Sequence, residues 1–105
     1  MWKRVCDPGA VAPGGMKQFN LEGGPSILIV NAEGTCYAYQ AFCPHEAYKL
    51  EDGVHDGRVL TCLEHMWQFD VATGAPLADA ETGLEAYRLK EEDGALHVWI
   101  EGAAT

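Results

Sequence analysis

Two short motifs constrain the fold of this 105-residue chain more than any other feature: Cys43-Pro44-His45 and Cys62-Leu63-Glu64-His65. Each motif supplies one thiol and one imidazole, and both groups bind metals when deprotonated. Because residues 46–61 separate the motifs, a shared site requires a fold that brings two distant loops together. A zinc finger more often takes two Cys from one loop and two His from another. The mixed pairs therefore indicate a two-metal cluster with chemically different ends, with a structural zinc site or four unrelated residues as the alternative.

The sequence around the motifs predicts short strands separated by turns, with almost no helical periodicity. A run of β-branched and aromatic residues leads into Cys43, and a second hairpin leads into Cys62, so both ligand pairs fall on loops at strand ends. The predicted segments, in chain order, are strands 27–30 and 35–40 around a turn at 31–34, a hairpin over 54–60 turning at Asp56-Gly57, a strand 66–70 ending at a turn 72–74, and a hairpin of 84–90 with 95–100 across 91–94.

The length suits a single domain over residues 1–105, with no room for a second catalytic domain. Within it we expect a basal part, residues 1–41 and 69–105, that buries most of the apolar side chains. Residues 42–68 would form a smaller subdomain that carries the metal site.

The charge balance excludes some partners. Seven Lys and Arg stand against 16 Asp and Glu, a formal net charge of −9, which disfavours nucleic acid and anionic membranes. No apolar run approaches the ~18–20 residues of a membrane span, and no signal-peptide pattern follows Met1, so we expect a cytoplasmic protein. In a reducing compartment Cys6 and Cys36 are expected as small buried hydrophobic residues and not as a disulfide.

The two motifs, followed by Trp67-Gln68-Phe69-Asp70-Val71-Ala72-Thr73-Gly74, resemble the Rieske ferredoxin family over nearly the whole chain. The resemblance implies the all-β Rieske iron-sulfur fold, an antiparallel β-sandwich base with a small cluster-binding subdomain. It also implies one 2Fe-2S cluster in which two His replace two Cys on one iron. Carried over, Cys43 and Cys62 would hold the inner iron, and His45 and His65 the outer one.

Neutral imidazoles make the outer iron the easier one to reduce, which places Rieske potentials at roughly −150 to +300 mV, against about −400 mV for all-Cys plant-type clusters. Respiratory Rieske proteins carry an additional disulfide between the ligand loops, and here Tyr48 and Glu64 stand where those cysteines are expected. We therefore predict a potential at the low end of the range, suited to supplying an oxygenase.

Residues beside the ligands are candidates for partner docking. Pro44, Met66 and Trp67 would form an apolar collar, although Trp67 suits core packing equally well. Glu46 and Glu64 would meet basic partners, with simple solvated carboxylates as the alternative. His55 and His97 are expected to be solvated strand residues and not ligands.

A single cluster without a substrate domain predicts a monomeric one-electron carrier and not an enzyme. Within the family, the sequences around the motifs look most similar to ferredoxins of toluene-type (aromatic or alkene) diiron monooxygenases, which act in aromatic hydrocarbon catabolism. There a flavin-containing NADH oxidoreductase reduces the ferredoxin, which then reduces the hydroxylase. The alternatives are a ferredoxin of a Rieske ring-hydroxylating dioxygenase and a small Rieske-like subunit of a nitrite reductase.

Overall fold

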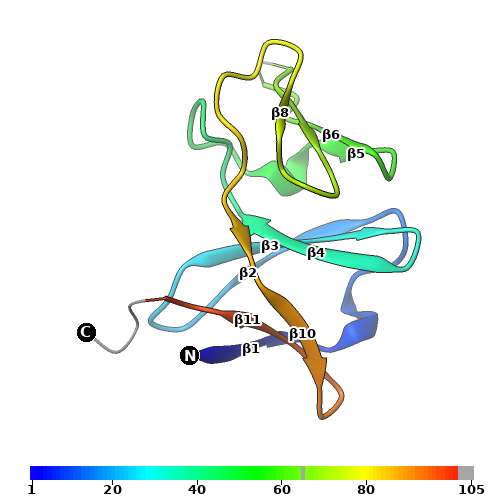
Figure 1. The fold of residues 1–105 in the computed structure, drawn as a ribbon, viewed down its shortest axis with the longest axis vertical. Coiled ribbons are helices and arrows are strands. Elements are labelled where there is room, and N and C mark those ends of the chain that lie inside the picture. The colour runs from blue at the N-terminus through cyan, green and yellow to red at the C-terminus, as the bar shows by residue number, and fades with distance from the viewer. Residues whose placement is uncertain (65, 102–105) are drawn as a thin grey trace.

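The computed structural model describes residues 1–64 and 66–101, which form three antiparallel β-sheets (Figure 1). The described residues contain no α-helix, so the predicted all-β class is confirmed. The strands are β1 (Trp2–Cys6), β2 (Met16–Asn20), β3 (Ser26–Ala32), β4 (Thr35–Gln40), β5 (Val54–His55), β6 (Val59–Thr61), β7 (Gln68–Asp70), β8 (Pro76–Leu77), β9 (Ala86–Tyr87), β10 (Leu89–Glu92) and β11 (Ala95–Trp99), with 3₁₀ turns η1 (Pro8–Ala10) and η2 (Leu50–Asp52). Their orders are β1-β11-β10, β2-β3-β4-β9 and β5-β6-β7-β8.

Strand β3 is buried on both faces. Successive side chains of a strand point to opposite sides. Accordingly, Ile27 and Ile29 enter a core cluster shared with β1 and β11, while Leu28 and Val30 enter a second cluster shared with the third sheet. All four side chains have no exposed surface. Residues 27–30 of this strand are apolar without interruption because each face of the strand lies in a different core cluster. The sheets β1-β11-β10 and β2-β3-β4-β9 form the sandwich of the base.

The third sheet and its loops lie on the other side of β3 and β4 (Figure 1). Hydrogen bonds from several elements join these loops to the base. They include Tyr39 Oη to Val71 O (2.5 Å), Gln18 N to Glu51 Oε1 (2.9 Å) and His55 Nε2 to Gly15 O (3.0 Å). The division of the chain at residues 42 and 68 stays a prediction.

The chain leaves the base after β4 and returns beside it at β9, which pairs with β4. Two hydrogen bonds join Gln40 and Glu85, the residues where the chain leaves the base and returns to it. The amide of Gln40 donates to the carbonyl of Glu85 (2.9 Å), and the amide of Glu85 donates to Gln40 Oε1 (2.7 Å).

The predicted hairpin of 27–30 with 35–40 is confirmed, since β3 and β4 pair across a short turn. The predicted two-residue turn at Asp56-Gly57 is wrong in length, because residues 56–58 separate β5 from β6 and the last strand pair is His55 with Leu60. Asp56 favours this longer loop: its Oδ1 accepts hydrogen bonds from the amides of Arg58 and Val59 (2.9 and 2.8 Å).

Two other predicted strands are shorter in the structure. The strand predicted over 66–70 begins only at Gln68, because Met66 has a left-handed backbone with φ of +59°. The segment 84–90 is divided between two sheets: β9 covers the edge of β4, and only β10 pairs with β11. Pairing with β4 satisfies edge groups that a single long hairpin would leave open.

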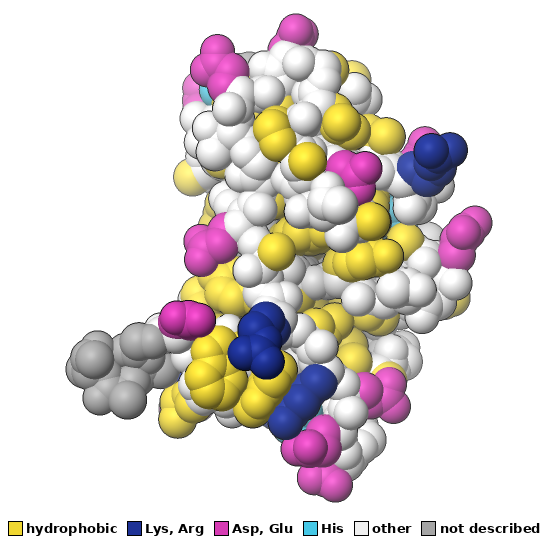
Figure 2. All heavy atoms as spheres, in the orientation of Figure 1, with side chains coloured by type: hydrophobic (Ala, Val, Ile, Leu, Met, Phe, Trp, Pro, Cys, Tyr) yellow, Lys and Arg dark blue, Asp and Glu magenta, His cyan; other side chains and the backbone are white. Residues whose placement is uncertain are grey.

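No helix among the described residues is long and apolar enough to cross a membrane. Acidic side chains are spread over the visible face of the molecule from end to end (Figure 2), in keeping with the net charge of −9.

Candidate metal centre

The two predicted ligand loops are closed in the same way. The amide of Cys43 donates to the carbonyl of Tyr48, and the amide of Cys62 donates to the carbonyl of Trp67, both at 2.9 Å. Each cysteine thus begins a loop whose closing bond lies five residues later. Residues 44–47 lie between the two ends of the first bond, and Leu63, Glu64 and Met66 lie between those of the second.

The two cysteines lie together in the interior. Cys43 and Cys62 are 4% and 2% exposed and belong to the same core cluster. Burial raises the pKa of the Cys43 thiol, and the adjacent Cys62 raises it further. Backbone amides of His45 and Glu46, which donate to the sulfur, lower the same pKa. A buried cysteine is deprotonated when it binds a metal, and amide N–H groups directed at its sulfur then stabilise the negative charge. The surroundings of Cys43 therefore fit the inner end of a Rieske cluster.

His45 lies at the surface, and aromatic rings connect it with the core. Its imidazole lies 4.5 Å from the indole of Trp67, centroid to centroid, at an interplanar angle of 38°. Trp67 also approaches Phe69 edge-on at 6.4 Å, and Phe69 is fully buried. Trp67 therefore contacts the opposite loop and packs against the core, so both roles weighed from the sequence are present in its geometry.

The structure brings Cys43, His45 and Cys62 into one region, and His65 lies outside the described residues. Among the described residues no three metal-ligating side chains surround a single point. A cluster that takes two protein ligands at each iron does not require such a group.

The docking candidates differ in exposure. Pro44 and Trp67 are half-buried, Glu46 is exposed, and Met66 is 58% exposed. Sequence reasoning missed Leu63, which is 51% exposed on the same loop as Met66. Its position, an apolar residue inside the motif Cys62-Leu63-Glu64-His65, could have indicated an exposed docking residue.

The prediction that His55 and His97 are solvated strand residues is wrong for His55, which is partly buried and hydrogen-bonded through both ring nitrogens. Gly57 N–H donates to the Nδ1 of His55 (3.0 Å), and its Nε2 therefore carries the hydrogen that it donates to Gly15 O. His97 contacts the carbonyl of Glu92 through Nε2 at 3.2 Å. His55 thus links the third sheet with the base.

The four cysteines form no disulfide. Cys6 is buried, as predicted, whereas Cys36 is only half-buried. Burial raises the pKa of both thiols.

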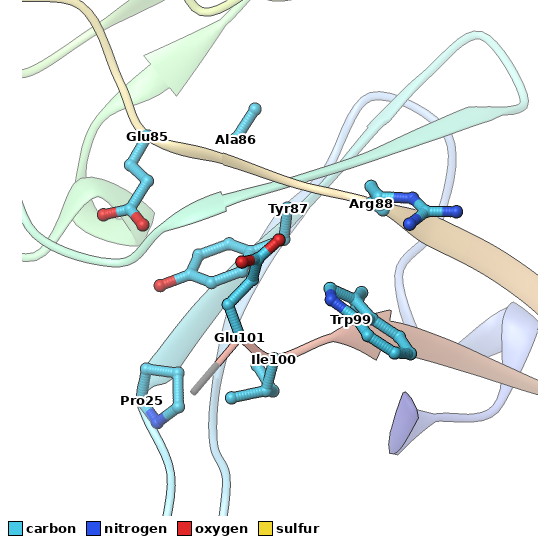
Figure 3. A pocket seen from close by; sticks show the side chains of 8 residues that line it. All are labelled: Pro25, Glu85, Ala86, Tyr87, Arg88, Trp99, Ile100 and Glu101. Atoms are coloured by element: carbon cyan, nitrogen blue, oxygen red, sulfur yellow. The ribbon is translucent and has the colours of Figure 1, made fainter. Parts of the chain in front are cut away.

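A hollow of about 280 Å³ on the base lies apart from these residues (Figure 3). Arg88 forms part of its wall and lies 5.7 Å from the ring of Trp99, a cation–π distance. The complete lining is Pro25, Glu85, Ala86, Tyr87, Arg88, Trp99, Ile100 and Glu101. None of these is a predicted ligand, so the hollow does not belong to the metal centre.

Comparison with known proteins agrees with this fold and donor set. Residues 1–88 match the family model described as the Rieske [2Fe-2S] domain, and the chain belongs to this family. It carries a Rieske 2Fe-2S cluster. Within the family it is an electron-carrying ferredoxin of an oxygenase system and not a catalytic enzyme.

Three relatives support this assignment. The methanesulfonate monooxygenase ferredoxin subunit of Methylosulfonomonas methylovora is 34% identical over 94% of this chain and 80% of its own length. The ferredoxin component of the alkene monooxygenase system of Xanthobacter autotrophicus is 35% identical over 92% and 80%. The ferredoxin component of the naphthalene 1,2-dioxygenase/salicylate 5-hydroxylase systems of a Ralstonia species is 35% identical over 67% and 68%. Among solved structures, a ferredoxin–oxygenase complex of carbazole 1,9a-dioxygenase matches with a TM-score of 0.83 and 26% identity, over 92% of this chain and 91% of the matched one.

Proposed function

We propose that this chain passes single electrons from a flavin-containing NADH oxidoreductase to the hydroxylase of a multicomponent diiron monooxygenase. One observation carries the choice of partner: monooxygenase ferredoxins match 92–94% of the chain, whereas the dioxygenase ferredoxin matches 67% at similar identity. We further propose a cytoplasmic monomer. The free state of all four cysteines supports a reducing compartment.

We propose Cys43 and Cys62 as ligands of the inner iron, and His45 and His65 as ligands of the outer iron. When bound, the cluster supplies a centre that accepts and releases one electron. The burial of the two thiols excludes water from the inner end, and the amides of His45 and Glu46 balance charge on the sulfur of Cys43. Exposure of His45 brings the outer end to the surface, where a partner can approach.

We propose that Pro44, Glu46, Met66 and Trp67 contribute to docking at this surface. Electron carriers need short-lived complexes with small interfaces. A net charge of −9 suits rapid encounter with basic faces on both partners.

Reconstitution tests the assignment. The purified holoprotein, an NADH-dependent flavin reductase and a diiron hydroxylase should together couple NADH oxidation to substrate hydroxylation. Omission of this chain should abolish turnover. The assignment fails if this chain delivers electrons for turnover of a Rieske dioxygenase but not of the diiron hydroxylase. Stable copurification with a siroheme protein would instead identify a nitrite reductase subunit.

A further inference from the structure

The loop between β6 and β7 carries an apolar side chain on a backbone conformation that L-residues avoid. Met66 has φ of +59°, in the left-handed region that glycine adopts without cost. Met66 lies directly before Trp67, whose carbonyl accepts the hydrogen bond from Cys62 that closes the loop. The geometry of this loop therefore favours glycine at position 66, yet the residue is methionine.

The side chain of Met66 is not buried in the core of the protein. Met66 is 58% exposed, and Leu63 on the same loop is 51% exposed. Among the described residues, six large hydrophobic side chains are exposed, and five of them lie between positions 42 and 66: Phe42, Tyr48, Val54, Leu63 and Met66. Of these, Leu63 and Met66 share one ligand loop, and Tyr48 lines the same hollow as Leu63, so apolar side chains are exposed beside the metal centre.

We propose that Met66, together with Leu63, enters an apolar recess on the oxygenase component and helps to determine which oxygenase this chain serves. The strained backbone is retained because the side chain contributes to binding and not to folding. The exposed carboxylates Glu46 and Glu64 lie on the same two loops, so the recess is bordered by basic side chains. This inference rests on the proposed function.

The test separates the side chain from the backbone strain. Met66→Gly removes both, and Met66→Ala removes the side chain but keeps the strained conformation. Asp93→Gly is the matched control: Asp93 is exposed, has φ of +52°, and lies in the β10–β11 turn of the base. Each holoprotein is measured for its unfolding rate in urea, its visible cluster spectrum and its KM as electron donor to the oxygenase.

Both Met66 variants should raise this KM at least five-fold with the cluster spectrum unchanged. Met66→Gly should unfold about five-fold more slowly than Met66→Ala, equivalent to about 1 kcal/mol. Asp93→Gly should also unfold more slowly, but with its KM unchanged.

A KM within two-fold of wild type for Met66→Gly overturns the inference. It is equally overturned if only the KM for the reductase rises, or if the substitution instead abolishes self-association. Wild-type protein that accepts electrons but supports no oxygenase turnover overturns the proposed function, and this inference with it. Active wild type with unaffected Met66 variants overturns the inference alone.

Discussion

Removal of one buried hydroxyl should loosen the attachment of the ligand loops to the base. Tyr39 is 2% exposed, and its hydroxyl donates to the carbonyl of Val71 at 2.5 Å. Tyr39→Phe keeps the ring but leaves this buried carbonyl without that donor, which costs about 1–3 kcal/mol. If the bond forms only after the transition state for folding, the variant unfolds roughly 5- to 150-fold faster.

The same hydroxyl predicts a pH dependence. Burial, with smaller contributions from Asp70 and Tyr37, raises the pKa of Tyr39 to about 12. The unfolded value is about 10, so folding favours the neutral phenol by about 2–3 kcal/mol. This stabilisation is complete below pH ~10 and is lost as the pH rises through about 12. The Phe variant should lack that component of alkaline destabilisation.

The assay is the rate at which urea abolishes the visible absorbance of the holoprotein, measured between neutral pH and pH ~12 with circular dichroism as a second probe. Tyr37→Phe is the matched control, because Tyr37 lies on the same strand and its hydroxyl makes no hydrogen bond to the described residues. Rates for Tyr39→Phe within two-fold of wild type at neutral pH, or an unchanged alkaline profile, would refute this reasoning.

Three further outcomes are expected. Cys43→Ser should abolish the 2Fe-2S spectrum and lower bound iron and acid-labile sulfide, while Cys36→Ser retains all three. Gly53→Ala should destabilise the protein by several kcal/mol, because its Cβ would lie 2.2 Å from the carbonyl oxygen of Thr61, and denaturant unfolding of the variant measures this. Electron-transfer rates with both partners should fall steeply between low and physiological ionic strength, and stopped-flow rates that stay flat across a salt titration would contradict electrostatic steering.

The sequence predicted the positions of the two cysteine-bearing loops better than it predicted the pairing of strands. Local patterns sufficed for the β3–β4 hairpin and for placing Cys43 and Cys62 on loops at strand ends. The fate of residues 84–90 could not be predicted in this way. Their division between two sheets depends on the free edge of β4, which is distant in sequence.

Within the site, local sequence patterns could not predict the exposure of individual side chains or the contacts between segments distant in sequence. The approach of Trp67 to His45 and the bond from His55 to Gly15 join segments that local periodicity treats separately. The left-handed backbone of Met66 was also missed, because methionine gives no sign of a turn.

The paired strands β4 and β9 have a consequence for how such a protein can be built. Because Gln40 and Glu85 meet, the long excursion between them begins and ends at neighbouring points of one sheet. A segment with adjacent ends can be inserted into another scaffold without stretching its host. Transfer of residues 41–84 to another protein therefore requires a host sheet with strands spaced like β4 and β9 and with an apolar face like that of Leu28, Val30 and Tyr39.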